Sequence, residues 1–184
     1  QPTMGTMELR KAMADFYHRW YGVEIDAASE VQPLIGSKEG ILHITLAFVN
    51  PGDEVLVPNP GYPTYTSLSK ILGAKVVNYN LDEDNGWQPD FEELEHRDLS
   101  RVKLMWTNYP NMPTGGDARM ETYRKLVDFA RRHDIVVVND NPYSFILNEH
   151  PLSLLQVEGA KDCCIELNSM SKGYNMPGWR VGMC

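Results

Sequence analysis

The stretch CCIELNSMSKGYNMPGWR, residues 163–180, passes from a short apolar run into a loop rich in serine and glycine. Residues 163–167 predict a β-strand, and the loop behind it presents Lys172, with Arg180 shortly after. A neutral lysine amine attacks carbonyl carbons, and hydroxyls with a guanidinium can hold a phosphate dianion. This order is typical of an α/β protein that presents an amine to an aldehyde cofactor carrying a phosphate, although a solvated lysine in a surface turn is the plainer alternative.

Short apolar runs and amphipathic segments alternate along the rest of the chain, which predicts an α/β fold of three layers, αβα, with a mostly parallel sheet. Strands are predicted over residues 54–57, 74–79, 102–107, 135–138 and 163–167. Helices are predicted over residues 7–21, 41–49, 63–72, 91–96 and 120–133. The first helix should bury Leu9, Met13, Phe16, Tyr17 and Trp20, and the last should bury Tyr123, Leu126, Val127 and Ala130.

The composition is that of an ordinary globular protein. The chain has 184 residues, of which 42% are hydrophobic and 23% charged, enough for one substantial core and one domain. A formal net charge of −8 without a basic cluster argues against a nucleic-acid surface. No run is long enough to cross a membrane, and the first residues do not resemble a signal peptide. Three cysteines are too few for a disulfide framework, so we expect a cytoplasmic protein without a bound metal.

Polar clusters stand at the ends of the predicted strands. They occupy residues 36–37, 59–62, 111–115, 139–140 and 169–172. Because the ligands of parallel sheets bind beyond the carboxyl ends of the strands, we expect these five clusters to converge on one cleft. Independent surface loops have no reason to share this register, so the convergence supports the chemical interpretation of Lys172.

Two of the clusters offer groups for a phosphate and a planar ring. Residues 36–38, Gly-Ser-Lys, open a helix whose free N–H groups and positive dipole end would bind a phosphate, with the Ser37 hydroxyl as an added donor. Ser37 could equally be a simple N-cap. Tyr62 could stack on a heteroaromatic ring, or it could belong to the core or to a turn.

Asp140 comes directly after a wholly apolar strand. A carboxylate at a buried strand end needs a partner, which a protonated ring nitrogen would supply. Tyr143 follows shortly and could donate to a ring hydroxylate, or it could pack against the sheet at the start of a helix.

Taken together, these segments resemble the large domain of the class I and II aminotransferases, fold type I enzymes that use pyridoxal phosphate (PLP). The matching segments are Gly-Ser-Lys-Glu-Gly-Ile at 36–41, Asn-Pro-Gly-Tyr-Pro-Thr-Tyr at 59–65, Pro-Thr-Gly at 113–115, Asp-Asn-Pro-Tyr at 140–143 and the loop at 169–180. They span nearly the whole chain in the family's order. The chain is most similar to the branch that contains diaminopimelate, alanine and aspartate enzymes.

The resemblance implies a role for each matching residue around the ring. Lys172 would form a Schiff base with the cofactor aldehyde and later move the substrate's α-proton. Asp140 would pair with the pyridinium nitrogen and keep it protonated, which makes the ring an electron sink. Tyr143 would hydrogen-bond the ring hydroxyl, and Tyr62 would stack on the ring. Lys172, Asp140 and Tyr143 are therefore the expected catalytic residues.

The resemblance also implies that the phosphate is held by Ser37, the backbone N–H of Lys38, Ser169 and Arg180. One position departs from the family's pattern, which usually reads Asn-Pro-Thr-Gly with an asparagine that donates to the ring hydroxyl. Here Met112 precedes Pro113, and a thioether cannot donate a hydrogen bond. Either Asn111 reaches the hydroxyl through a changed loop, which we favour, or Tyr143 holds it alone.

By the same resemblance, residues 1–184 form a PLP-binding large domain that is truncated at both ends and lacks the small domain. In the family, the small domain supplies the arginine that binds the substrate's α-carboxylate, and no residue here matches it. We therefore expect a fragment of a longer, homodimeric enzyme, and no turnover by these 184 residues alone. We also expect a further strand to run from Arg180.

Three functions follow from these residues. The first, which we favour, is PLP-dependent transamination between an α-amino acid and a 2-oxo acid. The second is another fold type I reaction, such as that of a carbon–sulfur lyase or a cyclopropane-forming synthase, because the residues that orient the substrate decide the reaction. The third is a PLP-binding module without catalysis, such as the sensor half of a regulator.

Overall fold

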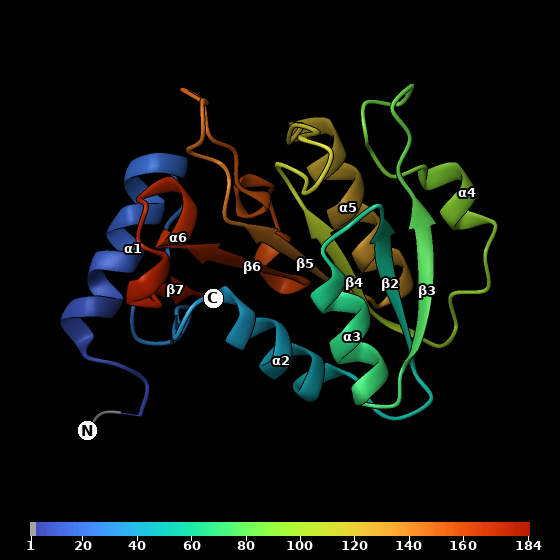
Figure 1. Ribbon diagram of the computed structural model, residues 1–184, viewed down its shortest axis with the longest axis horizontal. Coiled ribbons are helices and arrows are strands. Elements are labelled where there is room, and N and C mark those ends of the chain that lie inside the picture. Colours follow the sequence, from blue (N-terminus) through green and yellow to red (C-terminus); the bar gives the residue numbers. More distant parts are fainter. Residues whose placement is uncertain (1–2) are drawn as a thin grey trace.

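The computed structural model describes residues 3–184, which contain a seven-stranded mixed sheet in the order β1-β7-β6-β5-β4-β2-β3 (Figure 1). The strands are β1 Pro33–Leu34, β2 Glu54–Asn59, β3 Lys75–Asn80, β4 Val102–Asn108, β5 Val136–Asn141, β6 Cys164–Ser169 and β7 Gly182–Met183. The five neighbouring strands β3, β2, β4, β5 and β6 pair in parallel. Strand β7 lies between β6 and β1 and is antiparallel to both. The predicted mostly parallel sheet is confirmed, and β7 is the strand expected after Arg180.

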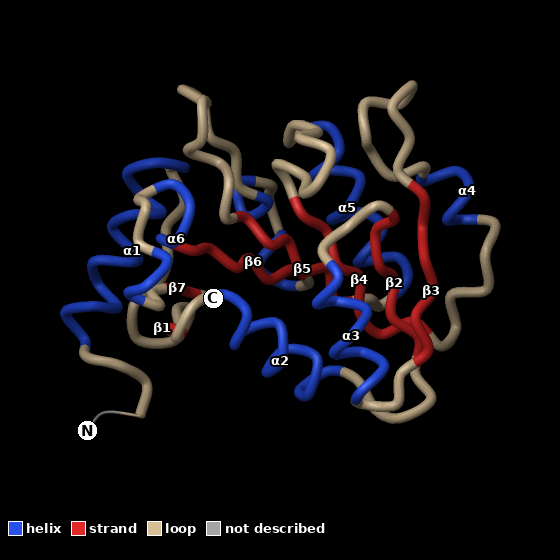
Figure 2. The backbone as a smooth tube through the Cα atoms, in the orientation of Figure 1, coloured by secondary structure: helices blue, strands red, loops and turns tan. Residues whose placement is uncertain are grey.

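Helices cover both faces of this sheet, which gives the three predicted layers (Figure 2). They are α1 Met7–Tyr21, α2 Ser37–Phe48, α3 Pro63–Ile71, α4 Phe91–Glu95, α5 Met120–His133 and α6 Met170–Gly173, with short 3-10 helices η1 Leu154–Gln156, η2 Ala160–Asp162 and η3 Pro177–Trp179. In β2, Val55 and Val57 pack in one cluster with α2 and α3, whereas Leu56 packs with α4 and α5 on the opposite face. A third cluster joins α1 to Met183 of β7.

Strands β5 and β6 extend further than their apolar sequences predicted. Asp140 pairs with Leu167, and Asn141 pairs with Asn168, so the ladder continues through residues that the sequence placed in loops. The polar side chains are tolerated because they bond to each other: Asn139 donates to Glu166 over 3.0 Å. Asp140 and Ser169 are therefore held in strands, which fixes their positions more firmly than loops would. Helix α2 likewise begins earlier than predicted, at Ser37.

The buried face of α1 differs from the predicted one. Leu9 and Trp20 are 41% and 46% exposed, so the prediction that they are buried is wrong. Arg10 is buried instead because its guanidinium donates to the carbonyls of Val31, over 3.2 Å, and Ala28, over 2.6 Å. Met13 and Tyr17 are buried as predicted, as are the four core residues predicted for α5.

Candidate cofactor site

A cleft of about 240 Å³ opens where β1, β2, β4, β5 and β6 end. Eight of the nine predicted site residues line it: Ser37, Lys38, Tyr62, Asp140, Tyr143, Ser169, Lys172 and Arg180. The remaining lining residues are Tyr65, Asn108, Met112, Pro142, Ser171 and Pro177. Side chains from five separate strand ends thus meet in one place, at the edge of the sheet where ligands of parallel sheets bind.

Asp140 is the buried carboxylate of this cleft. Its Oδ2 accepts a hydrogen bond of 2.9 Å from the Tyr65 hydroxyl, whereas its Oδ1 is buried and has no hydrogen-bond partner among the described residues. Burial raises the pKa of the Asp140 carboxyl to about 6; the bond from Tyr65 lowers it, and the charge of Glu166 adds to the rise. Because an unpaired buried carboxylate oxygen is costly, Asp140 suits a cationic N–H donor from a ligand.

Tyr65 is a site residue that the sequence analysis missed. Its ring is fully buried and stacks on Trp106, with ring centroids 4.9 Å apart and an angle of 7° between the planes. The ring of Tyr62 meets it edge-on at 5.6 Å. The spacing of Tyr62 and Tyr65 at the start of a predicted helix could have revealed the pair, because residues three apart lie on one helix face.

Replacing Tyr65 by phenylalanine is expected to raise the pKa of Asp140, because the hydrogen bond that lowers it is lost. As the pH falls from 8 to 5, the carboxylate of the variant should then be protonated earlier, and PLP affinity should fall at a higher pH than in the unchanged protein. Titration of PLP binding across this range measures the midpoint. The matched control is Tyr79→Phe, because the buried Tyr79 hydroxyl donates to the Trp106 carbonyl instead. Equal midpoints in Tyr65→Phe and the control would exclude the assigned role.

The N-terminus of α2 and Arg180 form a cradle for an anion. Gly36 precedes the helix with φ of 77°, and a Cβ there would collide with the Arg180 guanidinium, so only glycine allows this approach. Arg180 Nη1 donates to the Pro177 carbonyl over 2.9 Å and lies 3.5 Å from Ser171 Oγ. Free helix N–H groups, a guanidinium and hydroxyls are the donors that phosphate groups prefer.

Ser169, Lys172 and Tyr143 complete the polar part of the cleft. The Ser169 hydroxyl caps α6 by accepting from the backbone N–H of Ser171 over 3.2 Å, and α6 carries the exposed Lys172. Tyr143 is half-buried, and burial raises the pKa of its hydroxyl, with the charge of Asp140 adding to the rise. The ammonium of Lys38 lies 5.7 Å from the centre of the Tyr62 ring, a cation–π contact that the sequence did not predict.

Asn111 does not line this cleft. Its Oδ1 accepts from the Thr114 hydroxyl over 2.7 Å, and Met112 occupies the cleft wall in its place. Asn108, which the sequence analysis did not single out, also lines the cleft. Its Nδ2 donates to the Asp140 carbonyl over 2.7 Å, and its Oδ1 accepts from the backbone N–H of Met112 over 2.8 Å. Asn108 thus ties Asp140 to the loop that carries Met112.

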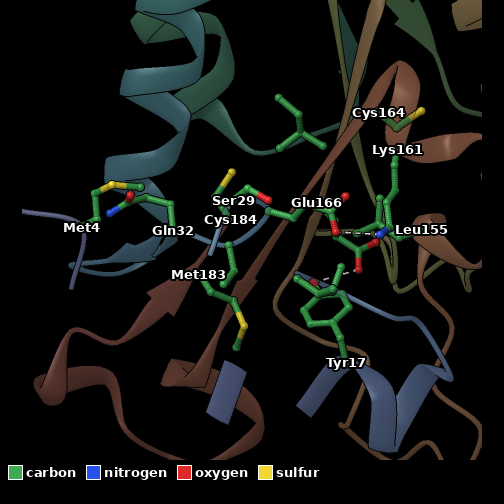
Figure 3. A pocket seen from close by; sticks show the side chains of 14 residues that line it. Met4, Tyr17, Ser29, Gln32, Leu155, Lys161, Cys164, Glu166, Met183 and Cys184 are labelled. Atoms are coloured by element: carbon green, nitrogen blue, oxygen red, sulfur yellow. Dashed lines mark hydrogen bonds and ion pairs between the residues drawn. The ribbon is translucent and has the colours of Figure 1, made fainter. Parts of the chain in front are cut away.

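Figure 3 shows a second cavity, of about 320 Å³, between α1, β6 and β7. Its buried carboxylate, Glu166, already accepts hydrogen bonds from Tyr17 over 3.1 Å, Ser153 over 2.7 Å and the backbone N–H of Leu154 over 2.9 Å. At its rim, Lys161 and Glu30 form an ion pair of 2.7 Å. Its charged groups are therefore already paired, in contrast to the unpaired Oδ1 of Asp140.

Comparison with protein families gives one description for the whole chain: the family model for aminotransferase class I and II matches residues 1–184. An LL-diaminopimelate aminotransferase of Dehalococcoides mccartyi is 46% identical over 183 residues, which are 98% of this chain and 47% of that protein. The LL-diaminopimelate aminotransferase of Aquifex aeolicus is 47% identical over 182 residues, with the same coverage. The chain spans about half the length of the curated relatives it matches.

Solved structures give the same result. The apo structure of BacF from Bacillus subtilis superposes with a TM-score of 0.95 at 42% identity, covering 100% of this chain and 47% of that one. An aminotransferase from Staphylococcus aureus superposes with a TM-score of 0.92 at 35% identity, covering 98% of this chain and 48% of that one. Among residues 3–184, no helix is long and apolar enough to cross a bilayer.

Proposed function

Because the chain belongs to the class I and II aminotransferase family, we propose that residues 1–184 are the PLP-binding large domain of an enzyme that transfers an amino group between an α-amino acid and a 2-oxo acid. The observation that carries this proposal is the unpaired, buried Oδ1 of Asp140, at the end of the cleft that also holds Lys172. The family uses PLP, and the cleft fits it: Asp140 suits the protonated ring nitrogen, and the cradle of Arg180 and α2 suits the phosphate.

When bound, PLP supplies an aldehyde that reacts with amines and a ring that withdraws electrons from the substrate's α-carbon. Asp140 would hold the proton on the ring nitrogen, since burial disfavours its charged carboxylate and a cationic partner offsets that cost. Tyr65 orients Asp140 by donating to Oδ2 and leaves Oδ1 for that nitrogen. Tyr62 and Tyr143 line the same cleft, where Tyr62 would pack against the ring and Tyr143 would donate to the ring hydroxyl oxygen.

Lys172 would supply the amine for the aldehyde of the cofactor, and the same amine, once free, could take and return the proton at the substrate's α-carbon. Helix α6, capped by Ser169, presents this side chain at the mouth of the cleft. Met112 lines the wall where the family usually has an asparagine, and its thioether donates no hydrogen bond. Tyr143 therefore holds the ring hydroxyl without help from Asn111.

Replacing Arg180 by alanine is expected to weaken PLP binding by about tenfold or more, because charge-assisted hydrogen bonds to the phosphate are lost. Pyridoxal, which lacks the phosphate, should bind the variant and the unchanged protein with affinities equal within about twofold. Absorbance titrations with the two compounds make the comparison. An equal loss for both compounds would place the phosphate elsewhere.

The reaction itself is tested in the longer homodimer that we propose these residues belong to. Transamination predicts that the visible absorbance of the PLP-loaded enzyme bleaches with an amino donor and returns with a 2-oxo acid. Release of ammonia without recovery would indicate a lyase, and absorbance that no amino acid changes would indicate a module without catalysis.

A further inference from the structure

Among residues 3–184, the buried acidic side chains are those of Asp140 and Glu166, which are 4% and 3% exposed. They lie on neighbouring strands, where Asp140 of β5 pairs with Leu167 of β6, and Asn139 pairs with Glu166. Neither carboxylate takes part in an ion pair of the described chain. The sheet therefore places a second acidic group without a cation directly behind the cofactor cleft.

Glu166 is surrounded by hydrogen-bond donors from α1, β5 and the start of η1, part of which Figure 3 shows. The five donors are the Tyr17 hydroxyl at 3.1 Å, the Ser153 hydroxyl at 2.7 Å, the side-chain amides of Asn141 at 3.4 Å and Asn139 at 3.0 Å, and the backbone N–H of Leu154 at 2.9 Å. Three of them are N–H groups, which cannot accept a hydrogen bond, so they fit the ionised carboxylate. Burial raises the pKa of the Glu166 carboxyl, and the hydrogen bonds oppose that rise.

Asn139 and Asn141 connect Glu166 to Asp140. They flank Asp140 in β5, and alternate side chains of a strand point to opposite faces of a sheet. Asp140 therefore faces the cleft, where Tyr65 donates to it, whereas both asparagines donate to Glu166 on the other face. Glu166 thus holds the strand on both sides of Asp140 from behind.

The cations near Glu166 pair with other acidic groups. Lys161 lines the cavity at Glu166 but pairs with Glu30 over 2.7 Å, and Arg131 of α5 pairs with Asp162 over 3.4 Å. The remaining titratable groups around Glu166 are phenols and a thiol, which are neutral at neutral pH: Tyr17 and Tyr21 of α1, Tyr123 of α5 and Cys164 of β6. Burial raises the pKa of each of these groups, and the charge of Glu166 adds to the rise.

The cations on the other side of the sheet do not pair with Asp140 either. Lys38, Lys172 and Arg180 line the same cleft, but none of them forms an ion pair with Asp140 in the described chain. The charge of Glu166 adds to the rise in the pKa of Asp140 that burial causes. The two carboxylates therefore repel each other across β5, and a cation bound at Asp140 would relieve both.

We propose that Glu166 is a positioning residue and the second anion of the cofactor site: it holds β5 behind Asp140 and adds a negative charge that favours the protonated ring nitrogen of PLP. A neutral ring would not offset this charge. The inference rests on the proposed function, because it takes the cleft at Asp140 as the PLP site.

The first test needs no cofactor. Carbon-13 nuclear magnetic resonance of the side-chain carboxyls follows Asp140 and Glu166 in the 184-residue protein from about pH 4 to about pH 8. Glu166→Gln should lower the pKa of Asp140 by about half a pH unit or more, because the second charge is removed. The new amide can donate to the hydroxyls of Tyr17 and Ser153, which can also accept, so we expect the variant to fold.

Asp140→Asn gives the reciprocal measurement. Coupling between two charges is the same in both directions, so this variant should lower the pKa of Glu166 by the same amount. Loosening of the strand would not produce matched shifts. Tyr17→Phe is the control, because it removes one donor to Glu166 and keeps the charge. It should move the pKa of Asp140 much less than Glu166→Gln does, and equal effects of these two variants would assign the shift to packing.

The second test uses PLP labelled with nitrogen-15 at the ring nitrogen. Bound to the unchanged protein, this nitrogen should keep its proton to a pH about half a unit or more higher than when it is bound to Glu166→Gln. The nitrogen resonance during a pH titration measures both midpoints.

The outcomes separate this role from the proposed function. An unchanged pKa of Asp140 in Glu166→Gln, or unmatched shifts in the two reciprocal variants, would overturn the charge coupling. Equal midpoints of the ring nitrogen in the two proteins would overturn the role of Glu166 as a second anion even if PLP binds at Asp140. Failure of PLP to bind would instead count against the proposed function, and the reciprocal shifts in the cofactor-free protein would still decide whether Glu166 acts on Asp140.

Discussion

Replacing Lys172 by alanine is expected to abolish covalent retention of PLP. The unchanged protein should keep its visible PLP absorbance through prolonged dialysis, whereas the variant should lose it. The reason is that α6 presents Lys172 to the cleft, while Lys38, the other lysine that lines it, lies against the Tyr62 ring. PLP should still bind the variant reversibly, since Asp140 and the cradle at Arg180 remain. Absorbance before and after dialysis gives the retained fraction directly.

Lys70→Ala is the matched control for this experiment. Lys70 is exposed in the last turn of α3 and does not line the cleft, so its variant should retain PLP as the unchanged protein does. If Lys172→Ala also retained PLP through dialysis, the amine would have to come from another residue, and the assignment of Lys172 would fail.

Replacing Asp140 by asparagine is expected to have opposite effects on stability and on cofactor binding. In the cofactor-free protein, burial raises the pKa of the Asp140 carboxyl from 3.8 to about 6, so the folded chain binds this proton more tightly than the unfolded chain. Stability therefore falls as the pH rises from about 4 to about 6 and stays lower above that range. The raised pKa corresponds to about 3 kcal/mol of unfolding free energy at pH 8.

Asp140→Asn removes this cost, because a neutral amide has no charge to desolvate. Denaturant unfolding of the cofactor-free variant should show a gain in unfolding free energy at pH 8 that disappears near pH 4. The same variant should bind PLP at least about tenfold more weakly, because the ring nitrogen loses its anionic partner. A variant that is less stable at pH 8, or that binds PLP as well as the unchanged protein, would contradict the role of Asp140.

The fold could be predicted because its pattern is local. Wholly apolar runs such as residues 135–138 and amphipathic segments such as 120–133 carry their structure in their own periodicity. The helix forms over the predicted residues, and the strand forms there but continues to Asn141. The parallel order then brings polar clusters to one edge, which is why eight site residues could be named before the structure. The carboxyl ends of β5 and β6 could not be predicted from the sequence, because Asp140 and Ser169 stay in strands only through partners on neighbouring strands.

The roles of the remaining site residues depend on tertiary contacts. The spacing of Tyr65 could place it beside Tyr62 but could not show its partner, because its hydroxyl meets Asp140, 2.9 Å away, only in the folded sheet. The loop after β4 places Met112 in the cleft and turns Asn111 toward Thr114, although the two are adjacent in sequence. Which of two neighbouring residues faces a cleft is decided by backbone conformation rather than by residue type.

The central claim is that five strand ends build one PLP site around Lys172. The most direct test is a peptide map of the unchanged protein after incubation with equimolar PLP and reduction with borohydride, which fixes the cofactor on the amine that holds it. We expect one pyridoxyl group per chain, on the peptide that contains Lys172. A label spread over surface lysines, or located at Lys38 rather than Lys172, would contradict the claim.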